Sequence, residues 1–418
     1  MERSHDQDAD NTVRHLRTLN CTTVFRYQPG RYVERQSFRP MISVLHVIDT
    51  GGPGGAETVF LNCATRLDPT RFTCTAVIND DAWLAQQLRA HGHEPRIESA
   101  RGSFNLGYLR RIAQIAREVR ANLICAHLYG SAVYASSLSL FSSIPLVSVF
   151  HGEADIAPED RFTFLKAAMI RKGSNRVVFV SHKLRTRLTR TLGIPIERTA
   201  IIPNGVDMDA FRPGTNDSVR RALGLPPEAI LVGAIGNIRP AKDYANLLRA
   251  ARVLVDRSDR FYFAIAGQYG GALATELMEL RSQLQLEDRV FFLGLRSDVA
   301  NIIQNLDVFV LSSRSEGFSI ACVEAMACGI PVVATRCGGP EEILNRETGV
   351  LAPAADPIGL ADGIHRIASN PEMAQALATA ARRRAEDEYS LHTMLTRYQG
   401  LFEDVINSAR PRRLSFRL

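Results

Sequence analysis

The sequence predicts an α/β fold of two doubly wound halves that face each other across a cleft. Short apolar strands alternate with helices from Met41 onward, as in the βαβ units of a parallel sheet. The alternation stops once, at the turn Pro203-Asn-Gly205, and then restarts with a new apolar strand. A chain of 418 residues is also too long for one ordinary domain, so two is the natural expectation.

The first half carries apolar runs of strand length separated by amphipathic segments. The segment 106–120 is typical of a helix, because Leu109, Ile112 and Val119 recur on one face. A glycine-rich loop, Gly51-Gly-Pro-Gly-Gly55, follows the first strand and opens the first helix. We expect strands at 42–48, 74–78, 122–126, 146–150 and 177–180, and helices at 56–67, 82–91 and 106–120.

The second half repeats this pattern, and its tail from Asp356 is helical. Pro371 is expected to start one tail helix, since proline suits the first helical position, and the last helix is expected near 391–407. We expect strands at 230–235, 261–266, 290–293, 307–311 and 330–334, and helices at 244–255, 272–284, 297–304 and from near Phe318.

Composition limits the possible classes of function. With 45% apolar and 22% charged residues, the chain is typical of a globular protein with enough apolar material for two cores. Its net charge of +6 is uneven, because Arg161–Arg190 holds nine basic residues and no acidic one. That run indicates either a solvated face or contact with anionic lipid or a phosphorylated partner. Nucleic acid is not favoured, since zinc-finger spacing and basic-aromatic motifs are absent from the sequence.

Two further features bear on location. The seven cysteines are scattered without a CxxC pair, which indicates reduced thiols in a cytosolic protein. Residues 122–151 contain no Asp, Glu, Lys or Arg, but they include His127, several serines and Pro145. This segment divides into strand, helix and strand rather than one membrane span. Peripheral attachment to a membrane remains an open alternative.

The stretch Ser312–Thr335 carries the strongest signal for a site. Glu316 and Glu324 lie eight positions apart across a loop-to-helix junction, and apolar residues surround Glu324. A carboxylate in such a place needs a partner, which is either backbone amides or a bound ligand. The helix N-terminus at 317–320 also offers free amides and a positive dipole end to an anion.

Three more features follow predicted strands. The loop 236–243 contains Arg239 and Lys242, which either clamp a diphosphate or lie in a solvated surface loop. His127 and His151 follow two strands of the first half, where each is structural or contributes to a site. The glycine loop is either a tight turn or an anion site. No His, Cys or Asp cluster in the sequence has metal-ligand spacing.

These motifs together resemble the family 4 glycosyltransferases of the GT-B fold. The resemblance rests on Glu316-Gly-Phe-Ser-x-x-x-x-Glu324, on Arg239 and Lys242 upstream, and on Pro203-Asn-Gly-Val-Asp207 between the halves. It covers roughly residues 42–407. It implies transfer of a sugar from a nucleotide-diphospho-sugar with retention of anomeric configuration. It implies no cofactor and no bound metal, the nucleotide-sugar being a substrate.

The resemblance also implies catalytic roles. Glu316 would contact the hydroxyls of the donor sugar, and His151 would lie beside the reacting sugar. Arg239 and Lys242 would hold the diphosphate and stabilise it as it leaves. His127 is the candidate on the acceptor side.

Donor-binding roles are carried over in the same way. Glu324 would accept hydrogen bonds from the ribose hydroxyls, and Arg296 would lie near the base. Many relatives have an arginine where this chain has Asn237, so Arg239 is expected to substitute for it. The remaining donor-binding candidates are backbone positions of three loops: Gly54, Gly55, Gly236, Gly317, Phe318 and Ser319.

The predicted organisation has four parts: a disordered leader at 1–40, an acceptor-side Rossmann-like domain at 41–207, a nucleotide-sugar-binding Rossmann-like domain at 208–390, and a C-terminal helix with a basic tail at 391–418. The predicted enzyme moves a hexosyl or N-acetylhexosaminyl unit, from a UDP-sugar first and a GDP-sugar second. Its acceptor would be lipid-linked or polysaccharide, in cell-envelope or exopolysaccharide synthesis. It would be cytoplasmic, with attachment to the inner face of the plasma membrane left open. A nucleotide-sugar epimerase of the same fold and a non-catalytic sugar-nucleotide-binding subunit are the alternatives.

Overall fold

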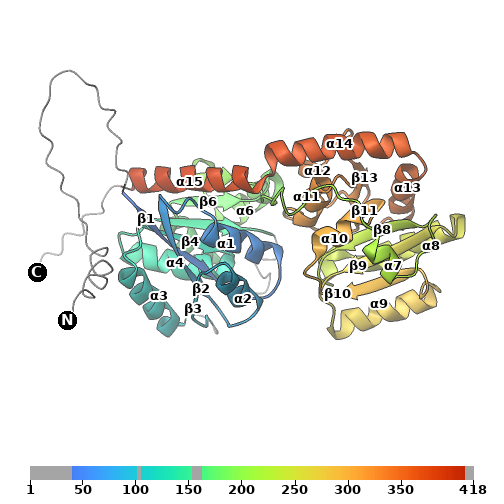
Figure 1. The fold of residues 1–418 in the computed structure, drawn as a ribbon. Helices are drawn as coiled ribbons and strands as arrows, with labels where there is room; N and C mark the ends of the chain where they lie inside the picture. The colour runs from blue at the N-terminus through green and yellow to red at the C-terminus, as the bar shows by residue number, and fades with distance from the viewer. Residues whose placement is uncertain (1–39, 101–104, 153–161, 410–418) are drawn as a thin grey trace, which may run out of the picture. The chain divides into compact units, whose positions relative to one another are not determined.

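The computed structural model describes residues 40–100, 105–152 and 162–409, which contain two parallel sheets (Figure 1). The predicted leader, apart from Pro40, and most of the basic tail therefore lie outside the described residues. The first sheet has seven strands, in the order β3 (Arg96–Ile97), β2 (Phe72–Ile78), β1 (Ile42–Ile48), β4 (Leu123–His127), β5 (Leu146–Phe150), β6 (Arg176–Phe179) and β7 (Thr199–Ile201).

The second sheet has six strands, and it too is parallel throughout. In each sheet the first strand, β1 or β8, lies in the interior. The next strands in the chain add to one side of it and the later strands to the other side, which is the doubly wound arrangement. The two-sheet prediction is confirmed. The order is β10 (Val290–Gly294), β9 (Phe261–Ala266), β8 (Ile230–Ile235), β11 (Val308–Leu311), β12 (Val332–Thr335) and β13 (Val350–Ala352).

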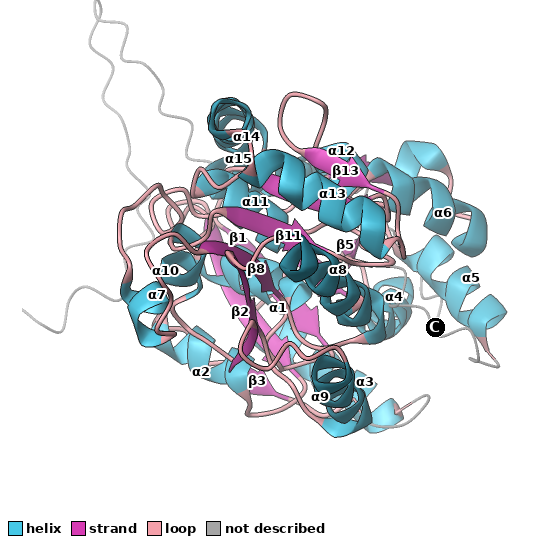
Figure 2. Ribbon diagram, turned by 90° about the vertical axis from the view of Figure 1, so that its right-hand side faces the viewer, coloured by secondary structure: helices cyan, strands magenta, loops and turns pink. Residues whose placement is uncertain are grey.

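Helices cover both faces of the strands (Figure 2). The strands are apolar at successive positions because both faces are buried, and every residue of β4 and β5 is buried. The helices are α1 (Gly55–Thr65), α2 (Trp83–Ala90), α3 (Leu106–Glu118), α4 (Tyr129–Phe141), α5 (Thr163–Gly173), α6 (His182–Leu192), α7 (Ser218–Ala222), α8 (Tyr244–Arg257), α9 (Gly271–Gln283), α10 (Val299–Gln304), α11 (Ile320–Ala327), α12 (Pro340–Ile343), α13 (Pro357–Ala368), α14 (Pro371–Glu388) and α15 (Leu391–Ser408).

Alternate residues of β1 face different helices. Val44 belongs to a core cluster that includes residues of α1 and α15. Leu45 and Val47 belong to another cluster, formed with α3 and α4. This alternation is the period of two that a strand with two covered faces requires.

The last helix returns to the first sheet. Tyr398 and Phe402 of α15 are fully buried in the cluster that contains β1 residues, and the Phe402 ring lies 6.4 Å from that of Phe72. The chain reaches this position beside the interdomain turn, where Val206 N donates to Tyr389 O and a Cβ at Gly205 would lie 2.8 Å from the Leu391 Cα. The predicted C-terminal helix is therefore part of the first core. The domain boundaries themselves stay predictions.

Most predicted elements are confirmed within one to three residues, and the strands at 42–48, 146–150, 230–235 and 261–266 match residue for residue. Sequence reasoning did not identify the short strands β3, β7 and β13, nor α5 and α6. Strands of two or three residues carry no periodicity, and both β3 residues are exposed. None of the helices in the described part of the chain is long and apolar enough to cross a membrane.

Substitution of Phe402 by alanine should destabilise the protein by about 3–5 kcal/mol, because it removes a fully buried ring from the first core. Chemical denaturation of the full chain measures this. Thr396, exposed on the same helix, provides the control, and T396A should cost less than about 0.5 kcal/mol. Equal effects of the two substitutions would contradict the packing of α15 on the first sheet.

Candidate functional site

Two loops of the second half are tied together at the carboxyl ends of neighbouring strands. They follow β8 and β11, which pair in the sheet. Ser312 Oγ donates to Lys242 O at 2.9 Å, and Arg314 N donates to Ala241 O at 2.7 Å. Arg314 Nε also donates to the buried Asp243 carboxylate at 2.6 Å. The 236–243 loop and the start of the 312–335 stretch therefore form one rigid unit.

An ion pair joins the two candidate residues of these loops. Lys242 Nζ lies 2.7 Å from Glu316 Oε1, and Ser313 Oγ donates to the same oxygen at 2.7 Å. The side chains of Lys242 and Glu316 are only 21% and 12% exposed, so solvent screens the pair less than a surface pair. A shielded lysine with three donors beside a carboxylate can exchange that partner for an incoming anion.

Glu324 lies in α11. The sequence left two possible partners for its carboxylate, backbone amides or a bound ligand, and the described residues provide no backbone partner. No hydrogen bond or ion pair that the structure gives for residues 40–100, 105–152 and 162–409 reaches its carboxylate. Burial raises the pKa of Glu324 to about 7, an effect that the charge of Lys242 partly offsets. The side chain retains some exposure, so a ligand can reach it. The described residues therefore do not support the alternative in which backbone amides bond to the Glu324 carboxylate.

The start of α11 lies against the end of β5. A Cβ at Gly317 would lie 2.2 Å from His151 O, so only glycine allows this approach of the two backbones. Ser319 caps the helix by accepting from Cys322 N at 3.3 Å, and Phe318 is buried against the Tyr389 ring. The predicted helix N-terminus and His151 are therefore brought together.

His151 and His127 contact each other directly. His127 Nδ1 lies 3.1 Å from His151 Nε2, and the two rings stack with centroids 5.3 Å apart. Burial lowers the pKa of His151 to about 3 and that of His127 well below its usual value, so both rings are neutral at pH 7. Cys125 Sγ lies 3.4 Å from His127 Nε2. His127 is fully buried, so its contact in this structure is with His151, and its acceptor-side role stays a prediction.

The glycine loop of the first half meets both second-half loops. Asn237 Nδ2 donates to Pro53 O at 2.8 Å, and Gln268 N donates to Asn237 Oδ1 at 2.9 Å. A Cβ at Gly55 would lie 3.3 Å from Ile320 Cδ1 at the start of α11, and Gly54 is the N-cap residue of α1. Asn237, at the position where many relatives have an arginine, therefore connects the glycine loop to the 236–243 loop.

Gly236 is required by its backbone. Its φ is +152°, and a Cβ there would lie 2.9 Å from Lys242 Cε. Tyr244 Oη donates to Gly236 O at 2.7 Å, which fixes the loop from the start of α8. Arg239, by contrast, is exposed at the N-cap of the turn Pro240–Lys242.

Arg296 follows β10 and is held by Asp298. Its Nε and Nη2 each donate to an Asp298 oxygen at 2.7 Å, and this pairing holds the pKa of that carboxyl well below its usual value. Sequence reasoning missed Asp298 as well as Ser313, Asp243 and Tyr244. Asp298 and Ser313 bond to candidates two and three residues away, whereas Asp243 bonds to Arg314 across two loops and Tyr244 bonds back to Gly236. Polar residues of this kind are common in loops, so nothing in the sequence marked them as partners of the site.

A possible set of metal ligands lies beneath α1 and α15. The ligand atoms of His46, Cys125 and His127 lie within 4.8 Å of one another, and all three residues are buried. The sheet register creates this group, because His46 pairs with Cys125 in neighbouring strands. Sequence spacing therefore could not reveal it. Burial lowers the pKa of His46 to about 3, so His46 is neutral there.

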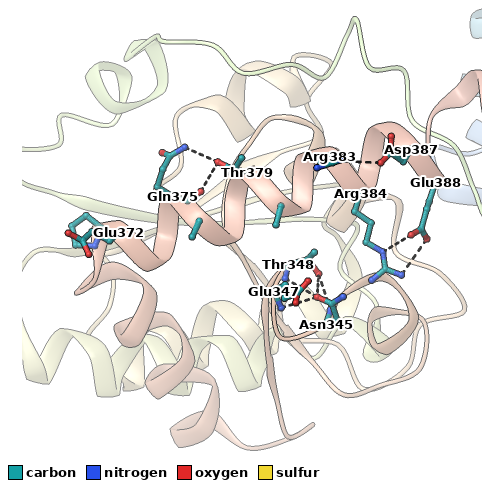
Figure 3. Close-up of a pocket in the computed structure, with 13 residues that line it drawn as sticks. Asn345, Glu347, Thr348, Glu372, Gln375, Thr379, Arg383, Arg384, Asp387 and Glu388 are labelled. Carbon is teal, nitrogen blue, oxygen red and sulfur yellow. Dashed lines mark hydrogen bonds and ion pairs between the residues drawn. The ribbon is translucent and has the colours of Figure 1, made fainter.

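A hollow of about 1130 Å³ lies away from these loops, between α14 and the turn 345–348 (Figure 3). That turn precedes β13, so it lies at the amino-terminal edge of the sheet, whereas the candidate residues follow the carboxyl ends. Arg384 and Glu388 pair there at 3.3 Å, along with other exposed charges. Polar and charged side chains make up most of the lining of this hollow, and none of the candidate residues belongs to it.

Comparison with known proteins gives two family matches. A model described as glycosyl transferases group 1 matches residues 215–384, and one described as glycosyltransferase family 4 matches residues 53–210. Together they cover most of both halves, including the glycine loop and the 312–335 stretch.

Curated relatives match over a shorter span. A D-inositol 3-phosphate glycosyltransferase of Saccharomonospora viridis is 31% identical over 262 residues, which are 58% of this chain and 61% of the relative. An N-acetyl-alpha-D-glucosaminyl L-malate synthase of Bacillus anthracis is 25% identical over 310 residues, 72% of this chain and 80% of the relative. The chain spans about three fifths of the length of the first of these relatives.

Solved structures share the fold. HepE from Anabaena, solved in complex with UDP-glucose, superposes with a TM-score of 0.78 at 23% identity, covering 87% of this chain and 100% of HepE. The lipopolysaccharide outer core galactosyltransferase WaaB superposes with a TM-score of 0.65 at 16% identity, covering 87% and 100%. The predicted GT-B fold is confirmed.

The raised pKa of Glu324 predicts a pH-dependent stability that E324Q removes. The folded protein keeps this proton up to about pH 7, whereas the unfolded chain releases it near 4.5. Because the folded pKa is raised, the contribution of Glu324 to stability falls as the pH rises through this window. E324Q should therefore become more stable than the parent between pH 4.5 and 7, by up to about 3 kcal/mol.

Urea denaturation at several pH values measures this difference. Glu347 is an exposed glutamate of the second half. The difference in unfolding free energy between E347Q and the parent should therefore stay constant across the same pH range. If the difference in unfolding free energy between E324Q and the parent also stayed constant with pH, Glu324 would have an ordinary pKa.

Proposed function

The chain belongs to the group 1 and family 4 glycosyltransferases, and we propose that it transfers a sugar from a nucleotide-diphospho-sugar with retention of anomeric configuration. The sugar would be a hexosyl or N-acetylhexosaminyl unit. UDP-sugars are the favoured donors and GDP-sugars the second choice. The acceptor would be lipid-linked or polysaccharide, in cell-envelope or exopolysaccharide synthesis, and the protein would act in the cytoplasm.

The names of related proteins support the donor class. Two curated relatives are named as a D-inositol 3-phosphate glycosyltransferase and an N-acetyl-alpha-D-glucosaminyl L-malate synthase. HepE has been solved with UDP and with UDP-glucose. These names agree on sugar transfer and favour a uridine nucleotide, while they differ in acceptor.

The observation that carries the proposal is the Lys242–Glu316 ion pair, in which Lys242 is close enough to Glu324 for its charge to lower the pKa of that carboxyl. Within the part of the chain that the structure describes, the Glu324 carboxylate has no hydrogen-bond or ion-pair partner. A diphosphate would take Lys242 from Glu316, because a doubly charged anion attracts the ammonium more strongly. Glu316 would then accept hydrogen bonds from the sugar hydroxyls, and Glu324 from the two ribose hydroxyls. In this structure Lys242 and Glu316 therefore pair with each other, and donor binding would replace that pairing with contacts to the diphosphate and the sugar.

The same arrangement would support the chemistry. Negative charge develops on the diphosphate as it leaves, and Lys242 and Arg239 would stabilise that charge. His151 lies against Gly317, so it would border the sugar as the bond to phosphate breaks. In this proposal the two cations do the work that a metal ion does in other transferases, and no metal is given a role.

Alanine at Glu316 or Lys242 should each lower kcat by about 100-fold or more, since each removes a charged contact to the reacting groups. Release of nucleotide from a UDP-sugar in the presence of acceptor measures this. E347A, at an exposed glutamate of the same half, should keep the parental rate. Parental rates for both E316A and K242A, in folded protein, would refute the site.

The same assay separates the proposal from its alternatives. A transferase releases nucleotide and glycosylates the acceptor. An epimerase converts the donor without acceptor, and a binding subunit does neither. Epimerised donor, or no turnover with every donor that binds, would overturn the proposal.

His127 should position His151 through its Nδ1. An asparagine places an amide group where Nδ1 lies, whereas glutamine places it near Nε2 and leaves the 3.1 Å contact unmade. H127N should therefore keep kcat within about threefold, and H127Q should lower it about tenfold, the value of one lost hydrogen bond. The donor KM should not change in either variant. Equal losses in both variants would indicate packing alone.

The basic run would place the protein at an anionic membrane surface. Arg161 lies outside the described residues, whereas Lys172 and Arg190 are exposed at the ends of α5 and α6. Each such charge contributes about 1 kcal/mol near an anionic leaflet, so K172E and R190E should each weaken vesicle binding at least fivefold. Sedimentation with anionic vesicles at low salt measures this, and R383Q on α14 is the control. No binding by the parent protein would refute membrane attachment.

A further inference from the structure

A groove runs along α4 on the first half. The residues Tyr129, Val133, Ser137 and Phe141 line it, and their spacing of four forms one stripe along the helix. The groove has a volume of about 510 Å³, and the stripe spans about 18 Å at 1.5 Å per residue. Residues of α3 and α5 form its walls. A groove of this length and volume, with walls on both sides, suits the binding of an extended molecule.

One end of the groove is polar and lies at the carboxyl edge of the first sheet. Asp49 follows β1 and Asn79 follows β2, and both line the groove. The Asp49 carboxylate packs against Gly130, where a Cβ would lie 1.9 Å from its oxygen. Ser131 hydrogen-bonds to this carboxylate, but the carboxylate's Oδ1 is buried without a hydrogen-bond partner among the described residues. That oxygen can still accept a hydrogen bond from a ligand. This end follows the strand that leads into the glycine loop.

The other lining residues are largely apolar, and several are unusually exposed. Leu106 at the start of α3 is 66% exposed and Phe141 at the end of α4 is 82% exposed, and both line the groove. Phe164 and Leu165 of α5, next to the lining residue Lys166, are 84% and 49% exposed. Exposed apolar side chains gathered around one groove indicate an apolar partner rather than chance.

We propose that this groove binds a lipid-linked acceptor. Its hydroxyl-bearing head would donate to Asp49 at the sheet edge, and its hydrocarbon chain would follow α4 past Leu106 to Phe141. The proposal rests on the transferase function, and it deepens that function by naming the acceptor class. A free polysaccharide has no hydrocarbon to cover these side chains, so the groove favours the lipid-linked alternative.

Dodecyl maltoside below its micelle concentration provides a probe, with maltose as the same head without a chain. Calorimetry on the full chain should show dodecyl maltoside binding at least about 100-fold tighter than maltose. L106S and F141D should each weaken this binding about tenfold, because both sites are exposed and the fold tolerates change there. I196S removes an equally exposed residue (63%) of the first half that is not part of the groove, and should change nothing.

A second variant tests the polar end. D49N should weaken dodecyl maltoside about tenfold while leaving unchanged the binding of a methyl-capped dodecyl ethylene-glycol ether, which has no hydroxyl to donate. Equal affinity for dodecyl maltoside and maltose would overturn the proposal. So would binding that survives L106S and F141D, or that D49N leaves unchanged.

Measuring UDP binding to the same samples separates a failure of the acceptor proposal from a failure of the transferase function. UDP that binds normally beside a groove that ignores the alkyl chain would overturn the acceptor proposal alone. Failure to bind or use any nucleotide-sugar would instead count against the transferase function.

Discussion

The ion pair between Lys242 and Glu316 is the interaction on which the rest of the site depends. The two charges lie 2.7 Å apart and are largely shielded from solvent. If either loop moved away, the other residue would keep an unpaired, partly buried charge, which would destabilise the fold. The loops must therefore be held in place. The hydrogen bonds of Ser312 and Arg314 to the 241–243 segment provide that support. Gly236 and Tyr244 fix the loop from the other side. The pair is thus both a structural element and, in our proposal, the part that donor binding rearranges.

Contacts between residues far apart in the sequence complete the arrangement. The Glu342 carboxylate accepts from the amides of His182 and Lys183, each at 2.7 Å, at the start of α6. The approach of Gly317 to His151 and the bond from Asn237 to Pro53 bring in β5 and the glycine loop. The last helix packs on the sheet in which the chain began. These contacts bring the glycine loop, His151 and the two second-half loops close together, although they lie far apart in the sequence.

Sequence reasoning predicted what depends on local pattern. Strands such as Ile42–Ile48 and Ile230–Ile235 are long apolar runs between turn signals, and they match the structure residue for residue. Glu316, Lys242 and His151 were found because they follow such strands or fall in a spaced motif. The role of Asp243 and the direct contact between His127 and His151 were not found, since only tertiary contacts define them. The groove along α4 was missed for the same reason. Its lining comes from three helices, α3, α4 and α5, and from several loops, so no single segment of the sequence reveals it.

The most direct measurement is a crystal structure of the protein with UDP. We expect the ribose hydroxyls to lie within hydrogen-bond distance of Glu324 and the diphosphate to contact Lys242, with the Lys242–Glu316 contact lengthened beyond its present 2.7 Å. Glu316 would then face the space that the sugar takes. A nucleotide bound elsewhere, such as the hollow beside α14, with the ion pair intact, would contradict the account.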